Sequence, residues 1–200
     1  SLQRCQAAIT GRPNHAGTTP MPLRKDALYA ASLLVAAVHD VAVDIPGDQV
    51  ATVGLLNVAP NAPNIVPGRV ELTIDMRDLS LATLGAMVNV LQQQIQAIAA
   101  STGTQIELHP QHFVEPTLAS PIIQAAIAAV CEDLQLTHYS MPSRAIHDAQ
   151  EIGRFTPMGM IFVPSQAGVS HAEDEYTSPE QCAQGADVLL QTLLRLDDQL

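Results

Sequence analysis

The chain has 200 residues, 47% of them hydrophobic and 14% charged, with a mean hydropathy of +0.15, a composition that excludes an intrinsically disordered chain. No uninterrupted apolar run approaches the roughly 20 residues of a membrane-spanning helix, so no membrane partner is expected. Nine basic against 20 acidic side chains give a formal charge of −11, which argues against a nucleic-acid partner because phosphates require a basic face.

The chain opens with a pattern that predicts a strand followed by a helix. Residues 4–10 are a short, largely apolar stretch bounded by Gly11 and Pro13, as in a strand. After a loop, apolar residues recur at helical spacing from Leu23 to Val41, and a Pro-Gly pair at 46–47 ends the run.

Two more strands, a helix and a fourth strand follow. Residues 50–58 and 69–77 have strand character, and the second segment alternates apolar with polar side chains. Ser80 can cap a helix with an apolar stripe from Leu84 to Ile98, and residues 105–109 predict another strand. The order strand-helix-strand-strand-helix-strand predicts a ferredoxin-like four-stranded sheet with two helices, in a domain over residues 1–115.

Residues 116–200 predict a partial α/β domain. Ser120 followed by proline opens a helix, and Ser178 to Gln181 form a capping box before a leucine-rich helix containing Leu189, Leu190, Leu193 and Leu196. Residues 158–163 are apolar on both faces, as in a buried strand of a parallel sheet. Too few elements accompany this strand to cover both faces, so exposed apolar surface is expected there.

Three isolated cysteines indicate a reducing compartment. Cys5, Cys131 and Cys182 are odd in number and far apart, which argues against a disulfide framework or a thiolate zinc site. The first residues also lack the basic-then-apolar pattern of a secretory signal. We therefore expect a cytoplasmic protein.

The most informative segment is the loop from Gly11 to Met21, where His15 opens the run His-Ala-Gly-Thr-Thr-Pro-Met. An isolated loop histidine is usually structural, but further motifs follow in order. They are Arg24 to Ala27, Pro63 to Gly68, Asp75 to Asp78, and Gly159 to Ser165 followed by Gly168 to His171. Together they resemble the C-terminal part of hydantoinase/carbamoylase-type zinc amidohydrolases, a group that includes N-carbamoyl-L-amino acid hydrolases, allantoate amidohydrolases and β-ureidopropionases and is related to aminoacylases and zinc carboxypeptidases.

The resemblance implies a division of labour between the two domains. Residues 1–115 correspond to a lid and dimerisation domain, and residues 116–200 to the C-terminal portion of the metal-dependent catalytic domain, which would make the protein a homodimer through the lid. His15 would reach a neighbouring subunit's site and stabilise the tetrahedral oxyanion. Asn64 and Arg77 would hold the substrate, since a guanidinium pairs with a carboxylate through two parallel hydrogen bonds. Without the resemblance, Arg77 is more simply a surface charge ending a strand.

The same resemblance makes His171 a metal ligand. Two Zn²⁺ ions are expected in the intact enzyme, with Mn²⁺ or Co²⁺ as alternatives. The family's other ligands and its catalytic Glu have no counterpart here, so the chain is expected to be a fragment that is inactive alone. His147 is a possible substrate contact, although a structural role is the simpler interpretation. Arg144 and Ile146 stand where the family usually has glycine, which leaves the substrate open.

The resulting functional hypothesis is hydrolysis of linear, non-peptide C–N bonds, as in N-carbamoyl-L-amino acids or allantoate-type ureides. The alternative hypothesis is a non-catalytic module for dimerisation or for binding small acids.

Overall fold

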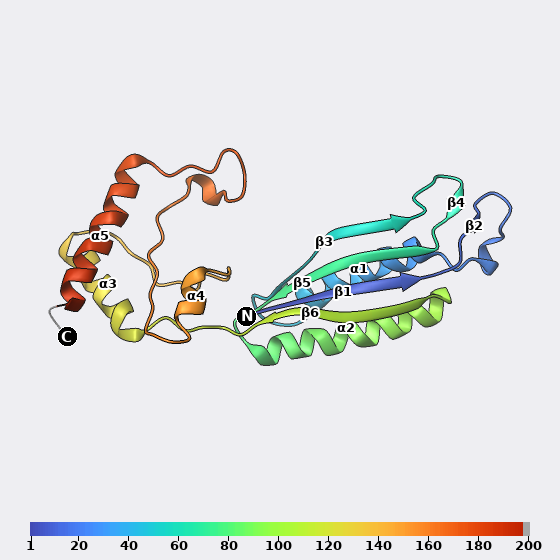
Figure 1. Ribbon diagram of the computed structural model, residues 1–200, viewed down its shortest axis with the longest axis horizontal. Coiled ribbons are helices and arrows are strands. Elements are labelled where there is room, and N and C mark those ends of the chain that lie inside the picture. The colour runs from blue at the N-terminus through green and yellow to red at the C-terminus, as the bar shows by residue number, and fades with distance from the viewer. Residues whose placement is uncertain (198–200) are drawn as a thin grey trace. The chain divides into compact units, whose positions relative to one another are not determined.

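The computed structural model describes residues 1–197, which divide into two compact units (Figure 1). The first unit runs from Ser1 to Pro116, and the second begins at Thr117. Each unit has its own secondary structure and its own buried core.

The first unit is built on a four-stranded antiparallel sheet. Its strands are β1 (Leu2–Thr10), β3 (Val50–Ala59), β5 (Arg69–Arg77) and β6 (Gln105–Val114). They lie in the order β3-β5-β1-β6, and each neighbouring pair is antiparallel. This order confirms the ferredoxin-like prediction. β6 is longer than the predicted segment 105–109, because it continues past an irregularity in its pairing with β1 that lies opposite Arg4 and Cys5.

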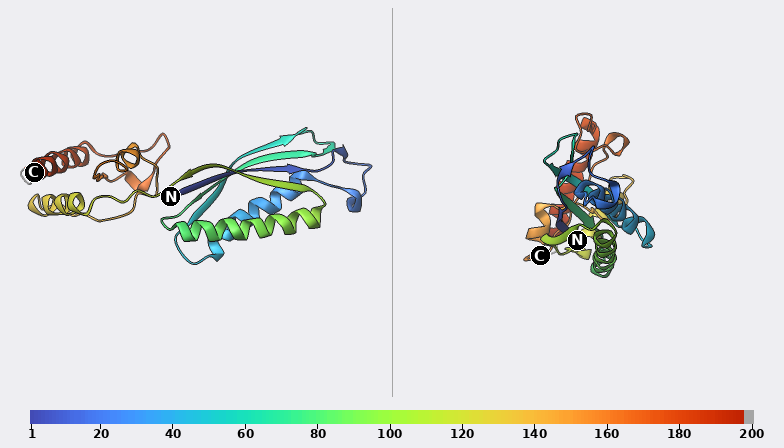
Figure 2. Two further views of the ribbon diagram at one scale, coloured as in Figure 1. Left: turned by 60° about the horizontal axis from the view of Figure 1, so that its bottom comes forward. Right: turned by 90° about the vertical axis from the view of Figure 1, so that its right-hand side faces the viewer.

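Helices α1 (Ala27–Asp44) and α2 (Leu81–Thr102) cover one face of this sheet (Figure 2). The alternation along β5 buries four side chains beneath them, and the helical stripes complete one continuous core. Its largest fully buried members include Ile9, Leu34, Leu72, Ile74, Met76, Met87 and Leu91. Removing this apolar surface from water is the main force that stabilises the unit.

The predicted start of the first helix at Leu23 is wrong. Leu23 lies in a separate 3₁₀ turn, η1 (Met21–Leu23), and its side chain is 72% exposed. The helix begins at Ala27 because the Asp26 carboxylate accepts hydrogen bonds from the backbone N–H groups of Leu28 and Tyr29, at 2.9 and 3.1 Å. An N-cap of this kind satisfies amides that the first helical turn leaves unpaired.

Helix α1 is long and apolar enough to cross a membrane by length and composition. The helix packs on the sheet instead, and its buried side chains include Ala27, Ala30, Leu34 and Val38. Its apolar stripe therefore serves the core between the helices and the sheet.

The second unit consists of helices joined by irregular segments. They are α3 (Pro121–Asp133), α4 (Asp148–Ile152), the 3₁₀ turn η2 (Gln166–Gly168) and α5 (Pro179–Asp197). α3 packs against α5 around Val130, Cys131 and Val188. The predicted capping box is confirmed: the N–H of Gln181 donates to Ser178 Oγ at 3.2 Å, and Gln181 Oε1 accepts from the N–H of Ser178 at 3.3 Å.

The predicted strand over residues 158–163 is wrong. This segment has no strand assignment, and Phe162 and Val163 are 52% and 39% exposed, while Met158 is buried. A strand requires a partner for its backbone hydrogen bonds, and no strand is assigned between residues 117 and 197. The apolar residues are present, but within the described residues they form no backbone hydrogen-bond ladder with a neighbouring strand. The leucine-rich face of α5 is also exposed, at Leu189, Leu190, Leu193 and Leu194.

Candidate functional site

His15 and Asn64 lie together beyond one end of the four-stranded sheet. Short strands β2 (Asn14–His15) and β4 (Ile65–Val66) pair antiparallel there, with His15 opposite Ile65. The N–H of Ala16 also donates to the carbonyl of Asn64 at 2.9 Å. The two strands form a small lobe (Figure 1), and His15 and Asn64 are both exposed on it.

The imidazole of His15 is held by the turn that follows it. Its Nδ1 accepts hydrogen bonds from the backbone N–H groups of Gly17 and Thr18, at 3.0 and 3.2 Å. A ring nitrogen that accepts from two donors carries no proton, so the neutral ring has its proton on Nε2. The side chain therefore offers an N–H donor on the edge that faces away from the turn.

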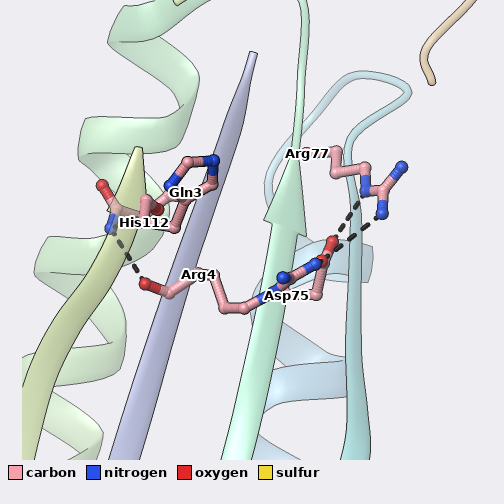
Figure 3. Close-up of polar contacts among 5 residues, drawn as sticks. All are labelled: Gln3, Arg4, Asp75, Arg77 and His112. Atoms are coloured by element: carbon pink, nitrogen blue, oxygen red, sulfur yellow. Dashed lines mark hydrogen bonds and ion pairs between the residues drawn. The ribbon is translucent and has the colours of Figure 1, made fainter. Parts of the chain in front are cut away.

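Arg77 lies at the opposite end of the sheet, where β5 ends. Its Nε and Nη2 donate to the two carboxylate oxygens of Asp75, at 2.7 and 3.4 Å (Figure 3). Arg4 on the neighbouring strand donates to the same carboxylate through Nη2, at 2.8 Å. Asp75 thus uses one edge of the Arg77 guanidinium and leaves Nη1 to meet another anion.

Opposing effects act on the pKa of the Asp75 carboxyl. Partial burial acts to raise its pKa, but the hydrogen bonds and charges of Arg77 and Arg4 outweigh that effect, so its pKa lies below the usual value. Two guanidinium groups against one carboxylate leave this cluster with an excess positive charge, which suits it to an anionic ligand. The sequence assigned no role to Asp75 or Arg4, although residues 75 and 77 are two apart on a strand and therefore share a face.

The structure does not bring all the candidate residues of the first unit together. β5 begins at Arg69, near the lobe of His15, and ends at Arg77. Eight residue steps of about 3.3 Å separate these ends by about 26 Å. His15 and Asn64 share one end of the sheet, and Arg77 belongs to the other.

In the second unit, His147 lies among side chains of its own unit. Its Nε2 is hydrogen-bonded to Ser143 Oγ, and its ring contacts that of Phe162 with centroids 5.7 Å apart. Arg144, between these residues, has a left-handed φ of 58°, a conformation that glycine adopts without strain. Ile146 is 48% exposed.

His171 is exposed and also left-handed, with φ 59°, and its N–H donates to Glu175 Oε2 at 2.9 Å. A neutral imidazole at this position is chemically suited to bind zinc. Residues 1–197, however, contain no group of three or more His, Cys, Asp or Glu side chains arranged to hold a metal ion. The described residues alone therefore do not fit a complete metal centre.

Comparison with known proteins places these motifs in context. Residues 12–195 match the model of peptidase family M20/M25/M40. The chain is 36% identical over 196 residues to an N-carbamoyl-L-amino-acid amidohydrolase of Paenarthrobacter aurescens, which covers 98% of this chain and 48% of that protein. It is 34% identical over 194 residues to the allantoate amidohydrolase of Bacillus subtilis, covering 97% of this chain and 47% of that protein.

A solved structure agrees with these sequence matches. The crystal structure of an amidase of the hydantoinase/carbamoylase family from Burkholderia vietnamiensis superposes with a TM-score of 0.92 at 36% identity, over 97% of this chain and 47% of that one. The chain therefore spans about half the length of the relatives it matches.

Proposed function

The chain belongs to peptidase family M20/M25/M40, and from that premise we propose that it takes part in hydrolysis of linear, non-peptide C–N bonds. The relatives named above act on N-carbamoyl-L-amino acids and on allantoate. Both ligands combine a carboxylate with a urea-like carbonyl carbon. The proposed substrate is therefore a small carbamoyl or ureide acid.

The observation that carries this proposal is the orientation of His15. Hydrolysis of a carbamoyl or amide group passes through a tetrahedral adduct whose oxygen is negatively charged. A fixed N–H donor aimed at that oxygen stabilises the transition state more than the ground state. With Nδ1 occupied by the turn, Nε2–H of His15 is the proposed donor, and Asn64, whose carbonyl accepts from the N–H of Ala16, is the proposed second contact to the same ligand.

Arg77 is the proposed anchor for the substrate carboxylate. A donor pair on a guanidinium matches the two oxygens of a carboxylate, and Nη1 together with the second hydrogen on Nη2 forms such a pair outside the two bonds to Asp75. A carbamoyl amino acid is far shorter than the roughly 26 Å between the two ends of the sheet. His15 and Arg77 can therefore serve one substrate only if they come from two copies of the chain, which supports the proposal of a homodimer.

The edge strand β3 is the proposed contact between those copies. The segment Val50–Ala59 carries no charged residue, contains no proline, and leaves Leu55 and Leu56 50% and 42% exposed. The other edge, β6, carries Glu107 and Pro110, features that discourage pairing with a further strand. The β3 edge is thus the better surface for a second sheet.

The proposed cofactor is Zn²⁺, with Mn²⁺ or Co²⁺ as alternatives, and His171 is its proposed ligand in this chain. When bound, such an ion supplies Lewis-acid chemistry to the site. Because the described residues form no complete metal centre, we expect the 200-residue chain to be inactive by itself. The two free, buried thiols, Cys5 and Cys131, are consistent with the proposed cytoplasmic location.

The decisive test is ammonia release from N-carbamoyl-L-amino acids and from allantoate. The assay compares the 200-residue chain with the protein expressed from the whole coding sequence, each supplied with Zn²⁺, Mn²⁺ or Co²⁺. In the active form, His15→Ala should lower kcat by roughly 10²–10³-fold. Arg77→Lys should selectively weaken substrates that carry the carboxylate.

Turnover that is unchanged in His15→Ala would remove this residue from the mechanism. If neither form releases ammonia but both bind N-carbamoyl amino acids, the non-catalytic binding module becomes the better description.

The dimer proposal is tested by sedimentation equilibrium. Leu55→Lys places a charge on the β3 edge and should shift the protein toward monomer, because a buried unpaired charge disfavours association. Phe113→Lys is the matched control, since Phe113 is 48% exposed on the β6 edge. Equal effects of the two substitutions would contradict the assignment of the interface to β3.

A further inference from the structure

We propose that Arg24 is a positioning residue for His15 and that it acts by holding the turn whose backbone selects the Nε2–H tautomer. This inference rests on the proposed function only in one respect, the use of the His15 Nε2–H to stabilise an oxyanion. The geometry of the turn itself is independent of any substrate.

The turn at residues 15–19 is closed from within by Thr19. Its N–H and its Oγ1 both donate to the carbonyl of His15, at 3.2 and 2.7 Å. Thr19 is buried, at 8% exposure, whereas His15 is exposed. The turn therefore has a fixed base beneath the histidine, and the two amides at its top, those of Gly17 and Thr18, point at Nδ1.

Arg24 closes the same turn from outside. Its Nη2 donates to the carbonyl of Ala16 at 2.6 Å, and its Nε donates to the carbonyl of Thr19 at 3.0 Å. These carbonyls flank the amides of Gly17 and Thr18. The planar guanidinium spans both at once, which a lysine ammonium cannot do with the same geometry. Arg24 is half-buried and directs these donors at main chain of the turn.

The fit around the imidazole is close. A Cβ added at Gly17 would lie 3.2 Å from Cε1 of His15 and 3.5 Å from its Nδ1. Such a contact is tight enough to push the ring away from the amides. Glycine at this position therefore allows the backbone to approach the ring nitrogen.

The chemical consequence is a choice between the two neutral tautomers. If Nδ1 carried the proton, that N–H would face two other N–H donors, an arrangement with no acceptor and a strong electrostatic penalty. The turn thus directs the proton to Nε2, on the edge open to ligand. A histidine free to exchange tautomers would present a donor there only part of the time, so Arg24 increases the fraction that is ready to bind a developing oxyanion.

The test is ¹⁵N NMR of the histidine rings in the full 200-residue chain, with the His15 signals identified by their loss in His15→Gln. In the wild type we expect an unprotonated Nδ1 and a protonated Nε2 for the neutral ring. Arg24→Met retains the apolar stem and removes both hydrogen bonds, so the His15 signals should shift toward the tautomer mixture of free histidine. Arg12→Met is the matched control, because Arg12 is an exposed cation in the same loop, and it should leave the signals unchanged.

A wild-type ring with the proton on Nδ1, or an Arg24→Met spectrum identical to the wild type, would overturn the proposal. The wild-type measurement tests the tautomer even if Arg24→Met fails to fold, and Arg24→Lys then tests the role of the guanidinium, since an ammonium cannot span both carbonyls. Thr19→Val provides a second variant, which removes the Oγ1 bond within the turn and should shift the same signals in the same direction.

Kinetics of the protein expressed from the whole coding sequence separate this inference from the proposed function. Arg24→Met should lower kcat only a few-fold, much less than His15→Ala, with KM nearly unchanged, because the donor acts on the transition state. The predicted tautomer without ammonia release would reject the proposed function and retain the positioning role. Ammonia release with an unaltered kcat in Arg24→Met would reject the catalytic consequence of that role.

Discussion

The two units of the chain bury their apolar residues in different ways. In the first unit, every long strand is paired and two helices close one face over a continuous core that includes Leu34, Leu72 and Leu91. In the second unit, the buried cluster at the contact of α3 with α5 is Val130, Cys131 and Val188. Four leucines on α5 remain about half exposed.

The difference teaches that hydrophobic side chains alone do not make a core. Residues 158–163 carry no polar side chain and β5 alternates apolar with polar ones, yet β5 is a central strand and the more apolar segment has no strand assignment. Backbone polar groups must be paired before a strand can be buried, because an unpaired buried amide is costly. Ladder partners on both sides allow β5 to be buried.

The largest expected effect tests this comparison with one chemical change made in both units. Val70→Ala removes two methyl groups from a fully buried site on β5 and should lower the free energy of unfolding of its unit by about 2–3 kcal/mol. Val188→Ala makes the same change in a small cluster whose neighbours are partly exposed. Because that site can relax, we expect about 1 kcal/mol. Urea unfolding, read with hydrogen exchange of amides in β5 and α5, measures each value.

Equal losses of stability at the two valines would contradict the difference between the units, since they would indicate a core of similar packing density in the second unit. A near-zero loss at Val188 would show that the second unit has an even looser core than we expect.

An intermediate effect is expected at the charged end of the sheet. Asp75→Asn should lower the free energy of unfolding at pH 7 by about 1 kcal/mol, because it removes the negative charge and one of the two acceptor oxygens that face Arg77 and Arg4, in a contact weakened by partial exposure to solvent. The pKa of Asp75 is lower in the folded state, so its contribution is complete above the unfolded value of about 4 and is lost as the pH falls through the folded pKa. The difference between wild type and variant should therefore be constant from pH 7 to about 5 and shrink below that. A difference that grows on acidification would contradict this sign.

An effect of similar size is expected at one of two serines that precede proline at helix starts. Ser178→Ala should cost about 1 kcal/mol in the stability of α5, because Ser178 Oγ accepts from the N–H of Gln181. Ser120→Ala is the control, since Ser120 makes no side-chain capping bond to α3, and it should cost only a few tenths. Thermal unfolding followed by circular dichroism provides the comparison. A larger loss at Ser120 would show that another contact of that residue matters.

Local patterns predicted most of the first unit. Strand alternation over residues 69–77 and the helical stripes were sufficient to predict the element order, and that order has one common antiparallel arrangement. The start of α1 was predicted too early, because apolar spacing continued through Leu23 while the capping carboxylate of Asp26 decides where the helix begins. Capping was the available signal that the prediction did not use.

The candidate site was predicted less completely. His15, Asn64 and Arg77 were selected through motifs, but the motifs do not indicate that the first two share a lobe and the third lies at the far end of β5. The supporting residues Arg24 and Asp75 were within the quoted motifs without an assigned role. Their roles depend on distances to backbone carbonyls and to a neighbouring strand.

The sequence by itself determined the periodicities, the Ser178 capping box and the order of elements, since each depends on residues only a few positions apart. Tertiary structure alone decided which apolar segments are buried and which end of the sheet holds each candidate residue. Those properties require partners distant along the chain: the lobe pairs residues 14–15 with 65–66, and Asp75 is shared with Arg4. Hydrogen bonds and buried contacts form between groups that are close in space. They therefore depend on how the chain folds and cannot be predicted from the residues that are adjacent in the sequence.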